Sequence, residues 1–222
     1  MSRVLPTHEA YDRWAPAYPP EPHNPLMRVE QQTMLDCWPQ QVVGARSLDL
    51  ACGTGRYAGL LRRSGASEVF ALDFSAAMLQ QVDAGHRVRA DMMQLPFVDG
   101  AFDVVICGLA LGHASVVSRW MSEVARVLRS NGVLLYSDFH PQAAEAGLTR
   151  SFRDASNHGV TLPHCRHGLQ AQREALAAAG LTLEVMREVR VGTELQEEFP
   201  GSEVFYQRWH GLPLVLIVRA SK

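Results

Sequence analysis

The chain has 222 residues, of which 47% are hydrophobic and 20% charged, and its formal net charge is −2. This length suits one medium-sized domain, and the near-neutral charge argues against nucleic acid or an anionic membrane as the partner. The four cysteines form no CxxC pair, which argues against a metal site or a disulfide framework. No segment has the pattern of a signal peptide, and no apolar run approaches the roughly 20 residues that span a membrane. We therefore expect a cytoplasmic protein, monomeric or homodimeric, that holds no metal.

The first 25 residues are rich in proline, tyrosine, tryptophan and histidine. Five prolines between residues 16 and 25 restrict any helix in this stretch to about residues 7–14. Apolar residues return at helical spacing over 26–37 and predict a second helix, with Met27, Gln31, Met34 and Leu35 on or near one face.

From residue 47 onward, short apolar runs alternate with amphipathic segments. Strands are predicted at 47–50, 69–72, 86–90, 102–107, 133–137, 181–191 and 212–219, and helices at 55–63, 76–84, 115–128 and 169–179. Ser75 is a suitable N-cap for the second of these helices, and residues 130–132 form a turn. This alternation predicts a Rossmann-like, doubly wound α/β fold with a mostly parallel sheet.

The polar, His- and Arg-rich region 142–167 interrupts the alternation, and an acidic loop precedes the last strand. Insertions at the carboxyl edge of such a sheet usually build the site, so we expect residues 142–167 to lie beside the ligand.

A glycine turn joins the first predicted strand to its helix, in the sequence Leu-Asp-Leu-Ala-Cys-Gly-Thr-Gly over residues 48–55. Glycines allow a tight turn and close approach of a ligand to the N–H groups of the following helix. Asp49, Asp73 and Asp91 each close a predicted strand, and Asp73 follows Gly53 by 20 positions, the spacing at which a carboxylate binds ribose hydroxyls. These features predict a nucleotide-type pocket at the carboxyl edge of the sheet.

The motifs are similar to those of class I S-adenosylmethionine-dependent methyltransferases. The turn at 48–55 resembles their first motif, 71–79 their second, and 90–92 with 95–97 the segment beside the adenine. Residues 101–105 and 123–129 match their fourth strand and the helix after it. The resemblance covers about residues 8–140 and is strongest to the small-molecule branch (type 11), which includes ubiquinone/menaquinone-type and biotin-pathway-type enzymes. Ala51 stands where many relatives have glycine, and Ser130-Asn131-Gly132 where Pro-Gly-Gly is usual.

The resemblance implies one methyltransferase domain over residues 1–222, with a cap segment at 1–25, a substrate-side insertion at 142–167 and a seven-stranded sheet that ends in an antiparallel hairpin. It implies S-adenosyl-L-methionine as cofactor. Asp49 and the loop from Gly53 to Gly55 would hold its amino-acid end, and Asp73 its ribose. Asp91 and Met92 would flank the adenine, while Tyr11 and Tyr18 cap the cofactor. The other cofactor contacts expected are Ala51, Cys52, Phe74, Met78 and Cys107.

Three other functions compete with this interpretation. Gly53-x-Gly55-x-x-Ala58 together with Asp73 also fits a loose dinucleotide fingerprint. Asp49, however, would face a pyrophosphate badly but suits a cofactor that carries an ammonium and a sulfonium, and no domain for hydride transfer is evident. The intact glycine turn argues against a non-catalytic binding protein, whereas non-methyl chemistry with the same cofactor stays an alternative.

The expected reaction is O- or C-methylation of a small molecule by in-line displacement, in which the enzyme aligns the reacting groups. His113 and His140 follow predicted strands and are candidates for a general base, for substrate positioning, or for hydrogen-bonded wall residues. Trp14, Arg153 and His164 are candidate acceptor contacts. Arg150, Arg153 and Arg166 could pair with an acidic acceptor or form a solvated loop face.

Overall fold

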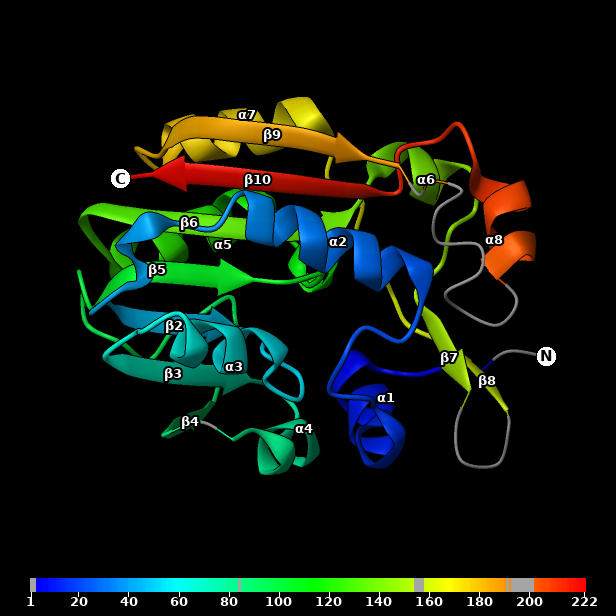
Figure 1. Ribbon diagram of the computed structural model, residues 1–222, viewed down its shortest axis with the longest axis horizontal. Helices are drawn as coiled ribbons and strands as arrows, with labels where there is room; N and C mark the ends of the chain where they lie inside the picture. Colours follow the sequence, from blue (N-terminus) through cyan, green and yellow to red (C-terminus); the bar gives the residue numbers. More distant parts are fainter. Residues whose placement is uncertain (1–2, 84, 154–157, 191, 193–201) are drawn as a thin grey trace.

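The computed structural model of the chain describes residues 3–83, 85–153, 158–190, 192 and 202–222 (Figure 1). Its main feature is a seven-stranded sheet in the order β4-β3-β2-β5-β6-β10-β9. Neighbours from β4 to β6 are parallel, whereas β10 runs antiparallel to both β6 and β9. The predicted Rossmann-like fold with an antiparallel C-terminal hairpin is confirmed.

The seven strands follow the apolar runs of the sequence. They are β2 (Arg46–Leu50), β3 (Glu68–Asp73), β4 (His86–Arg89), β5 (Phe102–Cys107), β6 (Leu128–Phe139), β9 (Thr182–Val189) and β10 (Val215–Ser221). Strand β6 is longer than predicted because it pairs with β5 on one side and β10 on the other. The predicted turn at 130–132 is an irregularity inside this strand, where Asn131 has a φ of 64°.

Five helices flank the large sheet at the predicted places: α2 (Pro25–Asp36), α3 (Arg56–Arg63), α4 (Ala76–Gln81), α5 (Val117–Val127) and α7 (Leu169–Ala178). Ser75 caps α4 as predicted, since its hydroxyl accepts a hydrogen bond from the Met78 N–H at 3.1 Å. Helix α4 ends three residues earlier than the predicted residue 84 because Val82 has extended backbone. The face predicted for α2 is wrong at Leu35, which is 41% exposed, because this helix turns Met27 and Met34 inward.

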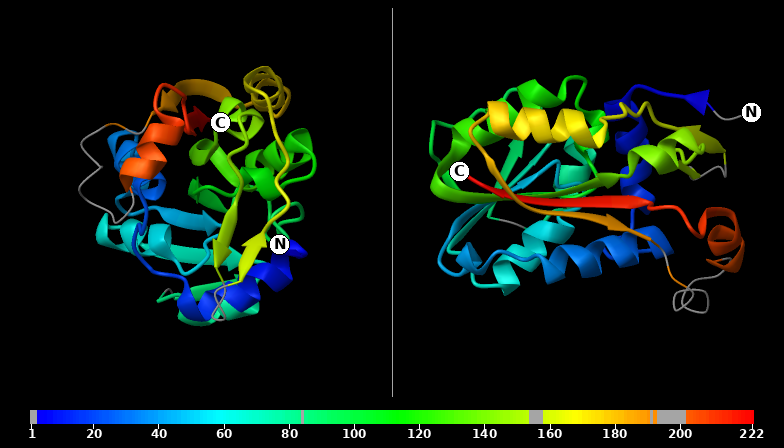
Figure 2. Two further views of the ribbon diagram at one scale, coloured as in Figure 1. Left: turned by 90° about the vertical axis from the view of Figure 1, so that its right-hand side faces the viewer. Right: turned by 90° about the horizontal axis from the view of Figure 1, so that it is seen from above.

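The core consists of two hydrophobic clusters, one on each face of the sheet. Helices α2 and α3 cover one face and α5 and α7 the other, as the view from above in Figure 2 shows. Trp120, Phe102 and Tyr136 are fully buried in one cluster, and Met34 and Leu61 in the other. Each such side chain contributes roughly 1.5–3 kcal/mol on burial. The helices of the described residues include none long and apolar enough to cross a membrane.

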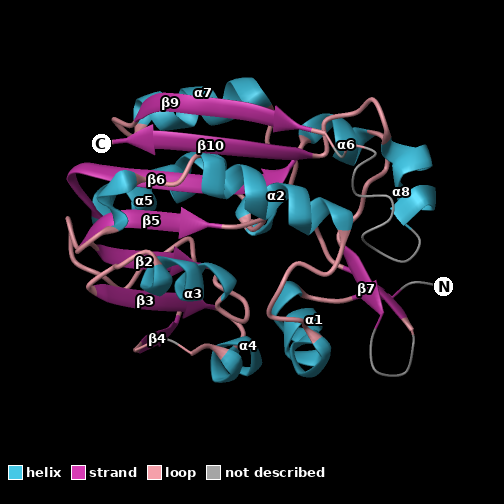
Figure 3. Ribbon diagram, in the orientation of Figure 1, coloured by secondary structure: helices cyan, strands magenta, loops and turns pink. Residues whose placement is uncertain are grey.

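A second, smaller sheet stands beside the first and was not predicted (Figure 3). Its order is β1-β8-β7, from β1 (Arg3–Val4), β7 (Ser151–Arg153) and β8 (Gly159–Thr161). It therefore joins the N-terminal segment to the region 142–167. Leu5, Ala10, Phe152, Val160 and Leu162 form its buried cluster.

The remaining helical segments of the described residues lie outside the two sheets, and they include two short 3-10 turns, Gln40–Val42 and Leu111–His113. Helix α1 (Thr7–Trp14) was predicted; a 3-10 turn (Ala15–Ala17) follows it. Helix α6 (Pro141–Glu145) and helix α8 (Ser202–Trp209) stand where loops were expected. The remainder of the expected acidic loop, residues 193–201, lies outside the described residues, as does the predicted strand end at 191.

Candidate functional site

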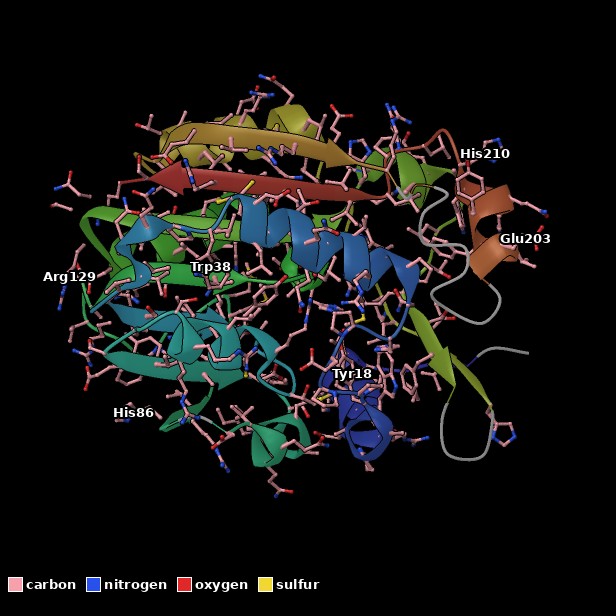
Figure 4. All side chains as sticks on the ribbon, viewed as in Figure 1. Tyr18, Trp38, His86, Arg129, Glu203 and His210 are labelled. Carbon is pink, nitrogen blue, oxygen red and sulfur yellow. The ribbon has the colours of Figure 1, made fainter. Side chains whose placement is uncertain are left out.

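A cavity of about 810 Å³ lies at the carboxyl ends of the parallel strands. Its walls come from the turns after β2, β3 and β5, from the N-terminal segment and from the chain between α6 and β7. Figure 1 shows α1, β7 and β8 on the side of the large sheet toward which the arrows of β2, β3 and β5 point. Figure 4 places Tyr18 on this side, beside α1, and His86 and Arg129 away from it. The two parts of the chain with the least regular sequence thus enclose the edge predicted to bind the ligand.

Asp49 is buried beneath the glycine turn, with an exposure of 1%. Its Oδ2 accepts a hydrogen bond from the Ala58 N–H at 2.7 Å, in the first turn of α3. Its Oδ1 has no hydrogen-bond partner among the described residues. Burial raises the pKa of this carboxyl to about 7. A buried oxygen without a donor suits a ligand that carries N–H groups, such as an ammonium.

The turn itself has left-handed backbone at three positions, with φ of 55° at Ala51, 55° at Gly53 and 85° at Gly55. A Cβ at Gly53 would have no atom within 4 Å, so the turn is open on its cavity side. A Cβ at Gly55 would lie 2.8 Å from the Val82 side chain, so glycine is required there for packing as well as conformation. Ala51 adopts its conformation despite a Cβ, which costs roughly 1–2 kcal/mol.

Asp73 joins two turns at the carboxyl edge. Its Oδ2 accepts from the Gly53 N–H and its Oδ1 from the Ser75 N–H, both at 2.8 Å. Burial raises the pKa of this carboxyl. Each oxygen keeps a further lone pair, because a carboxylate can accept about four hydrogen bonds.

The structure brings most of the predicted cofactor residues to the cavity wall, namely Tyr11, Tyr18, Asp49, Ala51, Cys52, Gly53, Asp73, Phe74, Asp91 and Met92. Gly55, Met78 and Cys107 do not line it. Met78 and Cys107 are fully buried behind the wall, where they pack rather than face a ligand.

The N-terminal segment is held over the cavity by contacts on two sides. Toward α4, Asp12 Oδ1 accepts a hydrogen bond from the Ser75 hydroxyl at 2.5 Å. Toward β7, the Trp14 ring stacks on Phe152 with centroids 4.3 Å apart and planes 3° from parallel. Helix α1 therefore bridges the cofactor side of the large sheet and the small sheet.

The two histidines predicted as catalytic occupy different places. His113 lines the cavity, and the Tyr11 hydroxyl lies 2.9 Å from its Nε2. Burial and the Arg150 charge lower the pKa of His113 well below its usual value, so the ring is neutral at neutral pH. His140 is 1% exposed and lies outside the lining, because its Nδ1 caps α6 by accepting from the Gln142 N–H at 3.2 Å.

Some of the predicted acceptor contacts line the cavity and others do not. Trp14 lines the cavity, whereas His164 lies just outside the lining, with its ring centroid 5.5 Å from that of Phe139. Burial lowers the pKa of His164 to about 4. The Arg153 side chain lies outside the described residues, and Arg166 is exposed and does not line the cavity. Three or more metal-ligating side chains do not gather anywhere in the described part of the chain.

Of the arginines in region 142–167 whose side chains the structure describes, Arg150 lines the cavity and Arg166 does not. Arg150 is 9% exposed, and its Nη2 lies 3.1 Å from Asp138 Oδ1. Its guanidinium also stacks over the Phe139 ring at 4.5 Å. Burial raises the pKa of Asp138 to about 6 even though Arg150 lowers it. Asp138 was not predicted as part of the site.

A buried acid on α2 was missed by sequence reasoning. Glu30 is fully buried; its Oε1 accepts hydrogen bonds from the Tyr57 and Ser137 hydroxyls, each at 2.6 Å. Its Oε2 lies 2.8 Å from the guanidinium of Arg56, which lines the cavity beside the glycine turn. The available signal was the spacing, since an acid at position 30 shares the inward face of an amphipathic helix with Met27 and Met34.

Comparison with known proteins places these features in a family. Residues 48–136 match the family described as "Methyltransferase domain". The chain is 36% identical over 132 residues to a malonyl-[acyl-carrier protein] O-methyltransferase of Enterobacter lignolyticus, covering 58% of this chain and 51% of that protein. It is 33% identical over 146 residues to a 2-phytyl-1,4-naphtoquinone methyltransferase of Trichormus variabilis, covering 59% and 63%. The chain thus matches about half to somewhat under two thirds of the length of these relatives.

A solved structure shows the same fold over nearly its full length. An S-adenosylmethionine-dependent methyltransferase from Mesorhizobium loti superposes with a TM-score of 0.71 at 23% identity, covering 87% of this chain and 98% of that one. The likeness to this structure concerns the fold alone. Residues 48–136 are therefore a class I S-adenosylmethionine-dependent methyltransferase domain, and S-adenosylmethionine is its cofactor.

Proposed function

We propose that this protein transfers a methyl group from S-adenosylmethionine to a small-molecule acceptor, by O- or C-methylation. The observation that carries the proposal is the glycine turn with Asp49 beneath it and Asp73 across it, all at one cavity. The curated relatives named above are by their names a malonyl-[acyl-carrier protein] O-methyltransferase and a 2-phytyl-1,4-naphtoquinone methyltransferase, which supports a small molecule or carrier-borne group as acceptor.

The cofactor would be held by groups of two kinds. The unpartnered oxygen of Asp49 and the open turn around Gly53 suit its amino-acid end, and the remaining lone pairs of Asp73 suit the ribose hydroxyls. Asp91 and Met92 would flank the adenine, with Tyr11 and Tyr18 as the cap. When bound, the cofactor supplies a methyl group already activated by its sulfonium.

The residues of the chain would align the acceptor and exclude water. Helix α1 and the segment between α6 and β7 close the cavity over the carboxyl edge, which favours the in-line geometry that methyl transfer needs. His113 is the candidate base if the acceptor must lose a proton, because it is neutral and lines the cavity. His140 would have a structural role rather than a catalytic one, because its ring caps helix α6.

We include the wider organisation in the proposal. The chain would act as one methyltransferase domain, a monomer or homodimer, in which segment 1–25 caps the cofactor and the insertion 142–167 contacts the acceptor. Four unpaired cysteines, three of them buried, favour a reducing and hence cytoplasmic location.

The direct test is calorimetric titration of the wild-type protein with S-adenosylmethionine, followed by the variant Asp73→Asn. We expect binding by wild type and a loss of roughly 1–3 kcal/mol in the variant, about a 5- to 150-fold weaker affinity, because the amide cannot accept from both ribose hydroxyls. Asp36→Asn is the matched control, since Asp36 is exposed and is not part of the cavity lining. Failure of the wild type to bind the cofactor would refute the proposal.

The reaction type needs a separate assay. Release of S-adenosylhomocysteine is measured with panels of carboxylates, phenols and carbon acids. Turnover of the cofactor accompanied by an acceptor gain of one methyl group is expected. Conversion of a substrate with the cofactor left intact would instead indicate non-methyl chemistry.

A further inference from the structure

Part of the cavity wall is aromatic. Trp14, Phe139, Phe152, Phe205 and Trp209 all contribute to the lining, from α1, the end of β6, β7 and α8. Such walls suit a planar or apolar body. Two cations, Arg150 and Arg208, also belong to this part of the wall.

The guanidinium of Arg150 is fixed in place. The backbone carbonyl of Arg150 accepts a hydrogen bond from the Leu162 N–H at 2.9 Å, which ties the residue to the chain that leaves β8. The side chain is then clamped between Asp138 and the face of Phe139. Its Nε has no hydrogen-bond partner among the described residues, so the guanidinium retains donor capacity within the protein.

The charges around the cavity are segregated. The acids of the lining, Asp49, Asp73 and Asp91, lie at the carboxyl ends of β2, β3 and β4, where the cofactor is proposed to bind. Arg150 lies instead beside Tyr11 and Phe139, and its charge acts on both Tyr11 and His113.

The neighbours of Arg150 on this side are uncharged at neutral pH. Burial raises the pKa of Tyr11 to about 12, and the pKa of His113 is lowered well below its usual value. The other two arginines of the lining have their own contacts, Arg56 with Glu30 and Arg208 with the Trp209 ring. Among the described side chains of the lining, Arg150 is therefore the arginine that lies beside Tyr11 and Phe139, and it is paired with Asp138.

We propose, building on the methyl-transfer function above, that the acceptor carries a carboxylate and that Arg150 binds it, with the rest of the acceptor against the rings of Trp14 and Phe152. A carboxylate matches the planar fork of a guanidinium. Asp138 already balances part of the Arg150 charge, so one further negative charge suits the site better than a phosphate dianion. Arg150 would thus be a specificity-determining residue for the acceptor.

The test compares a matched acid and amide, trans-cinnamate and cinnamamide, by calorimetry in the presence of saturating S-adenosylhomocysteine. Wild type is expected to bind the acid at least about tenfold more tightly than the amide, because a charge-assisted bidentate contact is stronger than a neutral one. In Arg150→Gln the affinity for the acid should fall to that for the amide. Arg166→Gln, an exposed arginine outside the lining, should keep the wild-type preference.

Two further measurements separate loss of the carboxylate contact from misfolding and from failure of cofactor binding. The paired variant Asp138→Asn/Arg150→Gln removes both buried charges together, so loss of the acid preference in this variant, with thermal unfolding still cooperative, excludes misfolding as the cause. Four outcomes would each overturn the proposal. In three of them, wild type binds acid and amide with equal affinity, binds phenyl phosphate more tightly than cinnamate, or binds no probe at millimolar concentration. The fourth outcome is an acid preference that survives Arg150→Gln. S-adenosylmethionine affinity is measured on the same samples: its absence in wild type contradicts the proposed function, whereas retained cofactor binding without an acid preference contradicts only the carboxylate site.

Discussion

Asp49 is a carboxyl group that the fold buries with one oxygen unpaired, and this has a consequence for stability. Its pKa rises from 3.8 to about 7 on folding, so between about pH 4 and pH 7 the folded protein holds a proton that the unfolded chain releases. Stability therefore falls as pH rises through this window. Asp138, with a pKa of about 6, acts in the same direction. At 1.36 kcal/mol per pKa unit, the Asp49 contribution is at most about 4 kcal/mol.

We predict that Asp49→Asn reduces the pH dependence of stability and also weakens binding of the cofactor. The amide keeps an acceptor for the Ala58 N–H but cannot ionise. Thermal unfolding of the protein without ligand at pH 5 and pH 8 should show a smaller loss of Tm in the variant than in wild type. Calorimetry should show S-adenosylmethionine bound at least about tenfold more weakly. An identical pH slope in the two proteins would contradict the buried, proton-binding state of Asp49.

Glu30 is the second residue whose environment decides its role. We predict that Glu30→Gln destabilises the protein by about 3–5 kcal/mol, because it leaves Arg56 without its buried counter-ion. Urea unfolding measures the change. Glu68→Gln is the control, since the Glu68–Arg46 pair is about half exposed and should change stability by no more than about 0.5–1 kcal/mol. Equal effects of the two substitutions would show that the Glu30 pair does not hold Arg56 at the cavity.

At the scale of elements, the chain brings distant segments together to close the cavity. Strand β1 pairs with β8 across more than 150 residues of sequence, from Arg3 to Val160. Helix α1 follows β1 directly, so this pairing positions the helix over the carboxyl edge of the large sheet. The N-terminal segment and the described part of region 142–167 are therefore one structural unit, held by the small sheet and its cluster.

The Trp14–Phe152 stack is the contact at which this unit can be tested. We predict a coupling energy of about 0.5–1.5 kcal/mol between Trp14→Leu and Phe152→Leu in a double-mutant cycle measured by urea unfolding, because stacked rings contribute beyond their buried area. A matched cycle between Trp14→Leu and Phe102→Leu should be additive within about 0.5 kcal/mol, since these residues belong to different clusters. Additivity in the first cycle would mean that α1 and β7 do not stabilise each other.

The regular elements were predictable where the hydrophobic pattern was long enough. All seven strands of the large sheet and the five helices that flank it fall on segments identified from periodicity. Strands β7 and β8 span only three residues each, which is too short for alternation to show. They are strands because each finds a partner, and that pairing depends on the folded chain.

At the scale of the whole molecule, the site is built from the start of the chain, its first half and the segment after β6. Ligand binding should therefore stabilise the global fold rather than one element. We predict that S-adenosylhomocysteine at 100 times its Kd stabilises the protein by about 2.7 kcal/mol and raises Tm by roughly 5–11 °C. NAD at the same concentration should leave Tm unchanged, as measured by differential scanning calorimetry. A shift with NAD and none with S-adenosylhomocysteine would restore the dinucleotide alternative.

The sequence by itself determined the half of the cavity wall that is proposed to bind the cofactor. The glycine turn, Asp49, Asp73 and Asp91 each belong to a single strand and its following turn, and parallel strands bring such turns to one edge whatever the details of packing. Only the tertiary structure decided the half of the wall that is proposed to bind the acceptor. It placed Arg150 against Asp138 and Phe139, set Glu30 beside Ser137 across 107 positions, and turned His140 away to cap α6. Those roles depend on which distant groups meet in the folded chain, and on the low dielectric of the interior in which they meet, and neither is encoded in local spacing.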